Sequence, residues 1–445
     1  MKKNVAEALA SASETKALQI GSNILHRLPE LFKEEFGEKR AIVVCDATTW
    51  NVAGSKVKDY LTSGGIRIEE PFVYDNPKPY AEFDNVLKLE EVLGKSNAIP
   101  IVVGSGTLND LTKLASSRTN RQYLCVATAA SMDGYTAYGA SITYQGAKQT
   151  FSCPAPQAIL ADIEIIRQAP PLMTAAGYAD LFAKVPAGAD WILADALGIE
   201  PIDEKAWSIV QDGLKDALAD PKGAREGKES AITSLIEGLM LGGFAMQWSK
   251  TSRPASGAEH QFSHLWNMEH HTHQGETPSH GFQVGVATLA VTRLYEKLLA
   301  SPVEQLDVEG CCKIWLEWGD LGKNAVEIFQ NTDFLDTAIT QSKEKYISKE
   351  ELAVQLEKLK AIWPELKEKL KNQLVPSEKL EESLRLVGAP VAPEQIGISK
   401  ERMKSSFLRA WYIRSRFTVL DVAVRTGWLN QWLNEIYKSD YGDDY

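Results

Sequence analysis

The chain has 445 residues, 44% of them hydrophobic and 24% charged, with a formal net charge of −11 at pH 7. This length favours two or three domains, and the composition is that of a soluble globular protein. The acidic balance argues against a nucleic-acid partner, which normally needs a basic face. No run approaches the ~18 apolar residues of a membrane span. Five cysteines without a C-x-x-C pair suggest a reducing compartment, so we predict a cytoplasmic protein.

The first 165 residues or so alternate short apolar runs with amphipathic stretches. The runs that predict buried strands lie at 41–45, 66–74, 99–103 and 123–128. Helical patterns at 51–61 and 83–93 lie between them, and this alternation predicts a parallel sheet covered on both faces. Two further runs, AYGASITY and AKQTF, flank Gln145-Gly146 and predict a hairpin.

The chain after Pro171 is predicted to be helical. A Pro-containing passage at 152–172 marks a boundary. We therefore predict an α/β domain over 1–165 and an all-α domain over 166–445. The periodic segments of the second part lie at 174–184, 206–218, 229–248, 256–271, 281–299, 313–329, 348–370 and 400–412.

Six of the chain's seven histidines lie within one stretch of 21 residues. They are His260, His264, His270, His271, His273 and His280. Histidine is the commonest metal ligand in proteins and the side chain most easily tuned for proton transfer near neutral pH. Such a concentration favours a metal site, and polar positions on a helix and a loop are the alternative.

Local patterns give part of this stretch a predicted geometry. Ser256 and Glu259 match a capping box, which predicts a helix that starts there. That helix places His260 and His264 one turn apart on one face. A second helix is predicted from about His280, whose side chain could fold back towards His260.

Two histidines form an incomplete site, because catalytic centres of the zinc type usually have three protein ligands and an open position. The residues alone leave the third ligand open among Asp180, Asp190, Glu259 and Glu276. Asp180 could equally form an exposed helix ion pair with Lys184, four residues further on.

A glycine-rich segment, GSGTLND at 104–110, directly follows one predicted strand and precedes a predicted helix. This arrangement offers backbone N–H groups and a helix dipole to a phosphate, although an ordinary tight turn is the alternative. Asp46 ends an earlier strand, where it could bind the ribose of NAD or cap its own turn. The hydroxyls of 128–134 could contact the cofactor while Asp133 points towards the substrate.

Several motifs in the same order together resemble the sn-glycerol-1-phosphate dehydrogenases, most closely the bacterial branch associated with arabinose-utilisation operons. The motifs are GSGTLND, TAASMDGY, AGYADLFAK, SRPASGAEHQFSH and SHGFQVG, with SRFTVLDVAVRTGWL near the end also similar. The resemblance covers most of the chain. It implies the superfamily of glycerol dehydrogenase, iron-type alcohol dehydrogenases and dehydroquinate synthase. The implied architecture is a Rossmann-like parallel sheet with a hairpin that binds NAD(P), over 1–165. An all-α domain that binds metal and substrate follows over 166–445, in the dehydroquinate synthase-like fold.

The resemblance also implies roles for individual residues. It places NAD(H) or NADP(H) against Asp46, Gly106, Thr107, Leu108, Asn109, Asp110, Thr128, Ser131 and Ala137. Family members often carry serine at the position of Ala137, which has no hydroxyl to offer. The resemblance further implies one divalent metal per chain, nickel first and zinc second, on Asp180, His260 and His280.

Substrate contacts and catalysis are implied for Asp133 and His264, with Asp180 also beside the substrate. Arg253 is a candidate for the substrate phosphate, and a solvated arginine before the histidine helix is the alternative. No role is assigned to His270, His271 or His273.

These roles predict a homodimeric, metal-dependent oxidoreductase that interconverts dihydroxyacetone phosphate and sn-glycerol 1-phosphate with NAD(P). The alternatives are a glycerol or polyol dehydrogenase of the same superfamily and a non-catalytic protein that binds nucleotide and metal. Dehydroquinate synthase is disfavoured, since its metal carboxylate is usually Glu rather than Asp.

Overall fold

The computed structural model describes residues 3–76, 79–145 and 147–438. The chain divides into two compact units. Unit 1 comprises Met1–Leu181, Glu204–Ala255 and Leu386–Ala389, and unit 2 comprises Phe182–Asp203, Ser256–Arg385 and Pro390–Tyr445. The domain boundary predicted at residue 165 stays a prediction.

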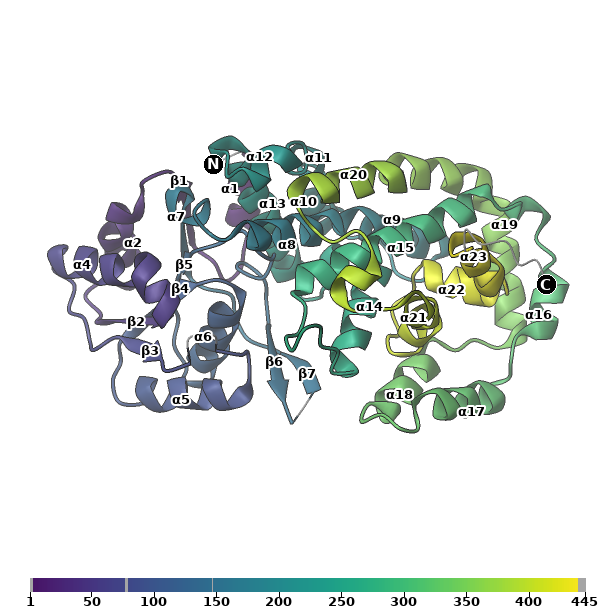
Figure 1. Cartoon of the computed structure of the whole chain (residues 1–445), viewed down its shortest axis with the longest axis horizontal. Helices are drawn as coiled ribbons and strands as arrows, with labels where there is room; N and C mark the ends of the chain where they lie inside the picture. Colours follow the sequence, from purple (N-terminus) through teal and green to yellow (C-terminus); the bar gives the residue numbers. More distant parts are fainter. Residues whose placement is uncertain (1–2, 77–78, 146, 439–445) are drawn as a thin grey trace. The chain divides into compact units, whose positions relative to one another are not determined.

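Unit 1 contains a six-stranded parallel sheet in the order β1-β8-β5-β4-β2-β3 (Figure 1). Its strands are β1 (Ala17–Gly21), β2 (Ala41–Asp46), β3 (Phe72–Tyr74), β4 (Ile99–Gly104), β5 (Leu124–Ala127) and β8 (Ala158–Asp162). The predicted α/β fold with a parallel sheet is confirmed.

Helices cover the sheet because alternate strand residues point to opposite faces. In β2, Ala41, Val43 and Cys45 pack into one core cluster with side chains of α2 (Leu28–Phe36) and α4 (Ser55–Ser63). Elsewhere in this unit, α5 (Phe83–Leu93) packs on α6 (Gly106–Arg118), which in turn packs on β4. The predicted helix at 83–93 is therefore confirmed.

Three strands differ from their predictions. The strand predicted at 66–74 is reduced to β3, with a single bridge between Ala41 and Ile68. Pro71 lies just before β3 and lacks the N–H group that a sheet ladder requires. The sequence patterns predict neither β1 nor β8, and β8 lies inside the passage interpreted as a boundary. Strand β8 is short and alanine-rich, and its partner β1 is remote in sequence, so neither has a strong local signal.

The predicted hairpin is present as β6 (Ala140–Tyr144) paired antiparallel with β7 (Ala147–Phe151). Of the predicted turn, Gly146 lies outside the described residues. The other helices of unit 1 include α1 (Lys3–Ser11), α7 (Ile163–Ile166), α8 (Pro171–Phe182), α10 (Glu204–Gln211), α11 (Leu214–Ala217), α12 (Pro221–Arg225) and α13 (Glu229–Ser249).

Unit 2 is helical, as predicted. Its helices include α9 (Lys184–Leu197), α14 (Ala258–Met268), α15 (His280–Ala300), α16 (Val308–Ile314), α17 (Trp318–Phe329), α18 (Leu335–Lys345), α19 (Lys349–Gln373), α20 (Ser377–Val387), α21 (Lys400–Tyr412), α22 (Val419–Arg425) and α23 (Leu429–Ile436).

The core of unit 2 forms around α14 and α15. Phe262 and Trp266 of α14 pack in the same buried cluster as Leu294 of α15. The Trp266 indole also donates a hydrogen bond to Ser406 Oγ at 2.9 Å, which ties α14 to α21. Within the described part of the chain, no helix combines the length and apolar character needed to cross a membrane.

Candidate functional site

His260 is held at the start of α14 by its neighbour Glu259. The helix begins at Ala258, with Gly257 as N-cap and no side-chain cap, so the predicted capping box at Ser256 is wrong. Glu259 reaches back two residues rather than three: its Oε1 accepts the Gly257 N–H at 2.7 Å. The same oxygen lies 2.8 Å from Nδ1 of His260.

His280 is the first residue of α15, as predicted. Ser279 caps that helix by accepting the N–H of Phe282. A hydrogen bond of 3.2 Å joins His280 Nδ1 to Ser263 Oγ of α14. The rings of His280 and His260 lie with their centroids 5.3 Å apart, so the two helices bring both imidazoles together.

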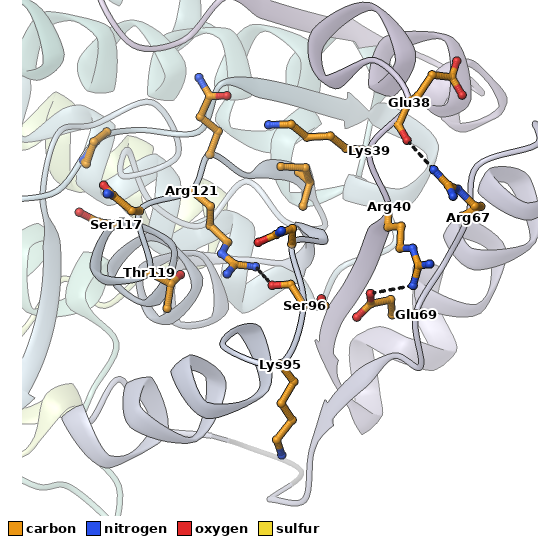
Figure 2. A pocket seen from close by; sticks show the side chains of 15 residues that line it. Glu38, Lys39, Arg40, Arg67, Glu69, Lys95, Ser96, Ser117, Thr119 and Arg121 are labelled. Carbon is orange, nitrogen blue, oxygen red and sulfur yellow. Dashed lines mark hydrogen bonds and ion pairs between the residues drawn. The ribbon is translucent and has the colours of Figure 1, made fainter.

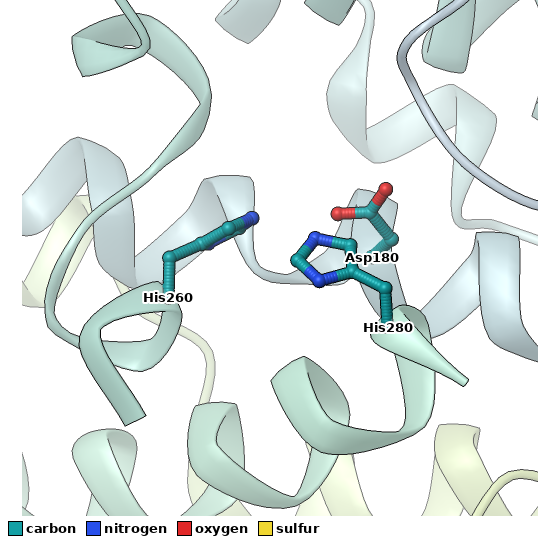
Figure 3. Close-up of side chains that lie close together, drawn as sticks. All are labelled: Asp180, His260 and His280. Atoms are coloured by element: carbon teal, nitrogen blue, oxygen red, sulfur yellow. The ribbon is translucent and has the colours of Figure 1, made fainter. Parts of the chain in front are cut away.

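The third member of the group is Asp180. One ligand atom from each of Asp180, His260 and His280 lies within 4.8 Å of the others, and the side chains converge in Figure 3. Asp180 and Lys184 are both fully buried, so the alternative of an exposed ion pair between them is wrong. Residue spacing alone does not choose among four acidic residues, and the structure favours the one that the family resemblance implies.

This group fits a divalent metal ion. Nδ1 of each histidine takes part in a hydrogen bond, so Nε2 would bind the ion. Such bonds to the second ring nitrogen orient metal-binding histidines and fix their tautomer. Two imidazole nitrogens and one carboxylate, with open positions, form a donor set of catalytic type.

The loop after β5 brings Asp133 towards Asp180. The Asp133 N–H donates to Asp180 Oδ2 at 3.2 Å. Close backbone contacts fix this loop, because a Cβ on Gly177 would lie 2.0 Å from the carbonyl oxygen of Ala130. A Cβ on Gly243 would likewise lie 2.7 Å from the carbonyl oxygen of Asp133. Only glycine permits these two approaches.

A buried lysine that the sequence analysis missed also holds this loop. The Lys113 ammonium donates to the carbonyl oxygens of Gly134 and Ala137 at 3.0 Å, and of Gly139 at 2.9 Å. Its one signal in the sequence is a lysine among leucines and small residues, in LNDLTKLASS.

The glycine-rich segment is the start of α6 rather than a loop before it, because the helix begins at Gly106. Its N-cap, Ser105, makes no side-chain capping bond. Leu108 and Asn109 are buried, and Asn109 donates to the carbonyl of Gly134 at 3.3 Å. Leu108 and Asn109 therefore help to pack the helix.

Five further predicted cofactor residues lie near strand ends, on the loop after β5 or on α6. Asp46 Oδ1 accepts the Thr49 N–H at 2.7 Å, so its capping role is real. Thr128 is buried beside the end of β4, where its N–H donates to the Gly104 carbonyl at 3.2 Å. The remaining positions are Asp110, whose Oδ2 accepts the Ser141 N–H at 3.1 Å, half-buried Ser131 and buried Ala137.

The structure gives the other histidines separate surroundings. His264 is half-buried on α14. On the surface, His270 Nε2 lies 3.0 Å from Asp333 Oδ2. The backbone of His273 forms an isolated antiparallel β-bridge with Glu276. His271 is buried between the Ile396 carbonyl at 2.7 Å and Arg402 at 2.8 Å.

Arg253 is buried in unit 1, so the alternative of a solvated arginine is wrong.

A cavity of about 970 Å³ lies elsewhere, where β2 and β4 begin and α6 ends (Figure 2). Several basic side chains that line it are paired with neighbouring residues. Arg40 pairs with Glu69 at 3.6 Å, and Arg121 donates to the Ser96 carbonyl at 3.1 Å. The cavity therefore lies at the amino ends of the strands. Asp46 lies at the carboxyl end of β2, so the cavity is not part of the candidate site.

The parallel sheet and the helical unit are those of the superfamily that includes the iron-type alcohol dehydrogenases, and the Asp/His/His group fits a divalent metal ion. The family model described as iron-containing alcohol dehydrogenase matches residues 19–170. Among solved structures, glycerol dehydrogenase from Schizosaccharomyces pombe aligns with a TM-score of 0.60 at 16% identity, covering 96% of this chain and 93% of that one. At this identity the match shows the fold alone.

The curated relatives assign the chain to one family within this superfamily. The chain is 33% identical over 299 residues to a glycerol-1-phosphate dehydrogenase of Halalkalibacterium halodurans, covering 67% of this chain and 75% of the relative. It is 28% identical over 385 residues to that of Geobacillus thermodenitrificans, covering 86% of each. The chain belongs to the NAD(P)-linked glycerol-1-phosphate dehydrogenase family.

Proposed function

We propose that this protein is an enzyme that interconverts dihydroxyacetone phosphate and sn-glycerol 1-phosphate with NAD(P). One observation carries the proposal: in a chain of this family, the ligand atoms of Asp180, His260 and His280 lie within 4.8 Å of one another. In the reductive direction, hydride passes from NAD(P)H to the carbonyl carbon and a proton reaches the oxygen. The products are sn-glycerol 1-phosphate and NAD(P)+.

One divalent metal per chain is part of the proposal, with nickel first and zinc second as the family resemblance implies. When bound, such an ion supplies Lewis-acid polarisation of a carbonyl or alcohol oxygen. The donor set suits nickel, zinc and iron alike.

The cofactor binds at the carboxyl end of the sheet in this proposal. The uncapped start of α6 has backbone N–H groups without helical acceptors, which suit the pyrophosphate. Asp46 uses Oδ1 for its own cap, and Oδ2 would accept a ribose hydroxyl. Its negative charge would repel a 2′-phosphate, so we propose that NAD(H) is accepted.

Proton handling and substrate orientation fall to His264 and Asp133. An imidazole whose pKa is ordinarily near neutral can deliver the proton that the product oxygen needs. The backbone N–H of Asp133 donates to Asp180, a proposed metal ligand. This bond holds the backbone of Asp133 in place, and its half-buried side chain starts from that position. We also propose a cytoplasmic protein, in keeping with five free cysteine thiols, and a homodimer, which rests on the family resemblance alone.

The test compares glycerol 1-phosphate with glycerol as substrates for oxidation by NAD+. Binding energy at the remote phosphate should position the reacting carbon, so kcat/KM should be far higher for the phosphate. Equal values would reject recognition of the substrate phosphate and favour a polyol dehydrogenase. Bound metal and NAD without turnover on either compound would favour the non-catalytic alternative.

A further inference from the structure

We propose that Glu259 is a positioning residue for His260, which it holds in the tautomer and orientation that present Nε2 to a metal ion. A second role is to place a buried negative charge behind that ligand. This inference rests on the proposed metal site. It concerns a residue that the sequence pattern had instead offered as a helix cap or as a metal ligand.

The hydrogen bonds of Glu259 lead directly to His260. Its side chain is fully buried. Oε1 lies 2.7 Å from the Gly257 nitrogen and 2.8 Å from His260 Nδ1. The carboxylate is acceptor-only, so the proton of His260 is on Nδ1 and the lone pair is on Nε2.

The charge of Glu259 has no basic counterpart on the described part of the chain other than this imidazole. Its other oxygen, Oε2, is buried and has no hydrogen-bond partner among the described residues. A buried carboxylate that lacks a counter-charge is unfavourable. A divalent cation bound to Nε2 of His260 would offset that charge, as in the carboxylate–histidine–metal arrangement.

The Glu259 carboxylate lies close against the backbone of Gly257. A Cβ on Gly257 would lie 2.8 Å from Glu259 Oε2 and 2.5 Å from Asp190 Oδ2, so the glycine is enclosed by both carboxylates. Asp190 anchors the same turn: it accepts the Ala258 N–H at 2.7 Å and the Tyr295 hydroxyl at 2.6 Å. Asp190 is therefore a matched control for Glu259.

The experiment measures nickel and zinc affinity of the metal-depleted full chain by competition with a chelator. In Glu259→Gln the charge is removed and an acceptor oxygen is kept. We expect its metal affinity to fall by about 10- to 100-fold. Asp190→Asn should lower the melting temperature of the metal-free protein with little change in metal affinity. The visible spectrum of the cobalt-loaded protein should change in Glu259→Gln and not in Asp190→Asn.

Unchanged affinity and spectrum in a folded Glu259→Gln variant would overturn the inference and leave the metal site standing. Equal losses of affinity in both variants would also overturn it, because they would show a purely structural role. If Glu259→Gln does not fold, Glu259→Asp, which keeps the charge on a shorter side chain, decides by the same criteria. A wild-type chain that binds no metal would instead refute the proposed function.

Discussion

The loop that carries Asp133 and the helix that carries His260 are held in place by different kinds of contact. The loop is held through its own backbone. The Lys113 side chain donates to its carbonyl oxygens, and Gly177 permits close approach to it. The start of α14 is fixed by two buried carboxylates, Glu259 and Asp190. Contacts to backbone groups do not depend on which side chains the loop carries, so the loop sequence does not predict them. Contacts made by side chains depend on residue type and can be predicted from the sequence.

This difference determines how each region should fail on mutation. Substitutions on the histidine helix should remove chemistry and leave the fold intact. Substitutions around the loop should destabilise unit 1, because they force backbone atoms apart.

The largest effect is expected for the histidines of α14. His260→Ala leaves at most Asp180 and His280 as ligands, so metal content should collapse together with activity. The matched variant His264→Ala keeps all three proposed ligands. Its metal should stay near one per chain while turnover falls about 100-fold, as for a lost acid–base group. Metal analysis by mass spectrometry beside steady-state kinetics checks both, and the reverse pattern would invert the two roles.

The next effect is expected at Gly177. A methyl group there would meet the Ala130 carbonyl oxygen at 2.0 Å, so Gly177→Ala should lower the free energy of unfolding by about 1–3 kcal/mol. Gly319→Ala is the control, because nothing lies within 4 Å of the new methyl group. Since alanine favours helix, this variant should be neutral or more stable by up to ~1 kcal/mol. Denaturant unfolding compares them, and equal midpoints for both variants would contradict the packing argument.

A smaller effect is expected at Asp46. Asn is also a good N-cap, so Asp46→Asn should keep the bond to Thr49 and the stability of the turn. Loss of the negative charge should shift the ratio of kcat/KM values towards NADPH by roughly tenfold, as for a repulsion of about 1.4 kcal/mol. Kinetics with both cofactors measure that ratio. A ratio equal to that of the wild type would remove Asp46 from the ribose site.

The smallest effect concerns pH. Burial, reinforced by the nearby charge of Arg402, lowers the pKa of His271 below its ordinary value of 6.5, although the bond to the Ile396 carbonyl opposes this. The unfolded chain then binds the proton more readily than the native one. Stability is full above pH 6.5 and falls as pH drops below that value. Melting temperatures at pH 7.5 and 5.5 should differ less in His271→Asn than in the wild type, and an equal difference would exclude His271.

Much of the candidate site could be predicted from the sequence because two of its three proposed ligands are histidines, of which the chain has only seven. The i, i+4 spacing of His260 and His264 and the predicted start of α15 at His280 rest on local helix periodicity. Asp180 could not be selected by spacing, since acidic residues are common and its approach to the histidines depends on long-range folding. The family resemblance supplied that choice.

The parts of the fold that could not be predicted are those with long-range partners. Strand β8 pairs with β1, and the lysine of α6 binds a loop more than 20 residues away. Similarly, the capping box at Ser256 failed because Asp190, 68 residues earlier, accepts the Ala258 N–H at the helix start, and Glu259 accepts the Gly257 N–H. Local patterns predict which residues form a helix, but the neighbours that tertiary folding provides decide how that helix begins.

The most direct test of the proposed function is NADH oxidation by dihydroxyacetone phosphate in metal-depleted protein, before and after nickel, zinc or iron is restored. The proposed function predicts negligible oxidation without metal, and recovery on reloading with sn-glycerol 1-phosphate as the product. Oxidation that persists undiminished after metal removal would contradict the role of Asp180, His260 and His280. A loaded protein that fails to oxidise NADH with this substrate would contradict the proposed reaction.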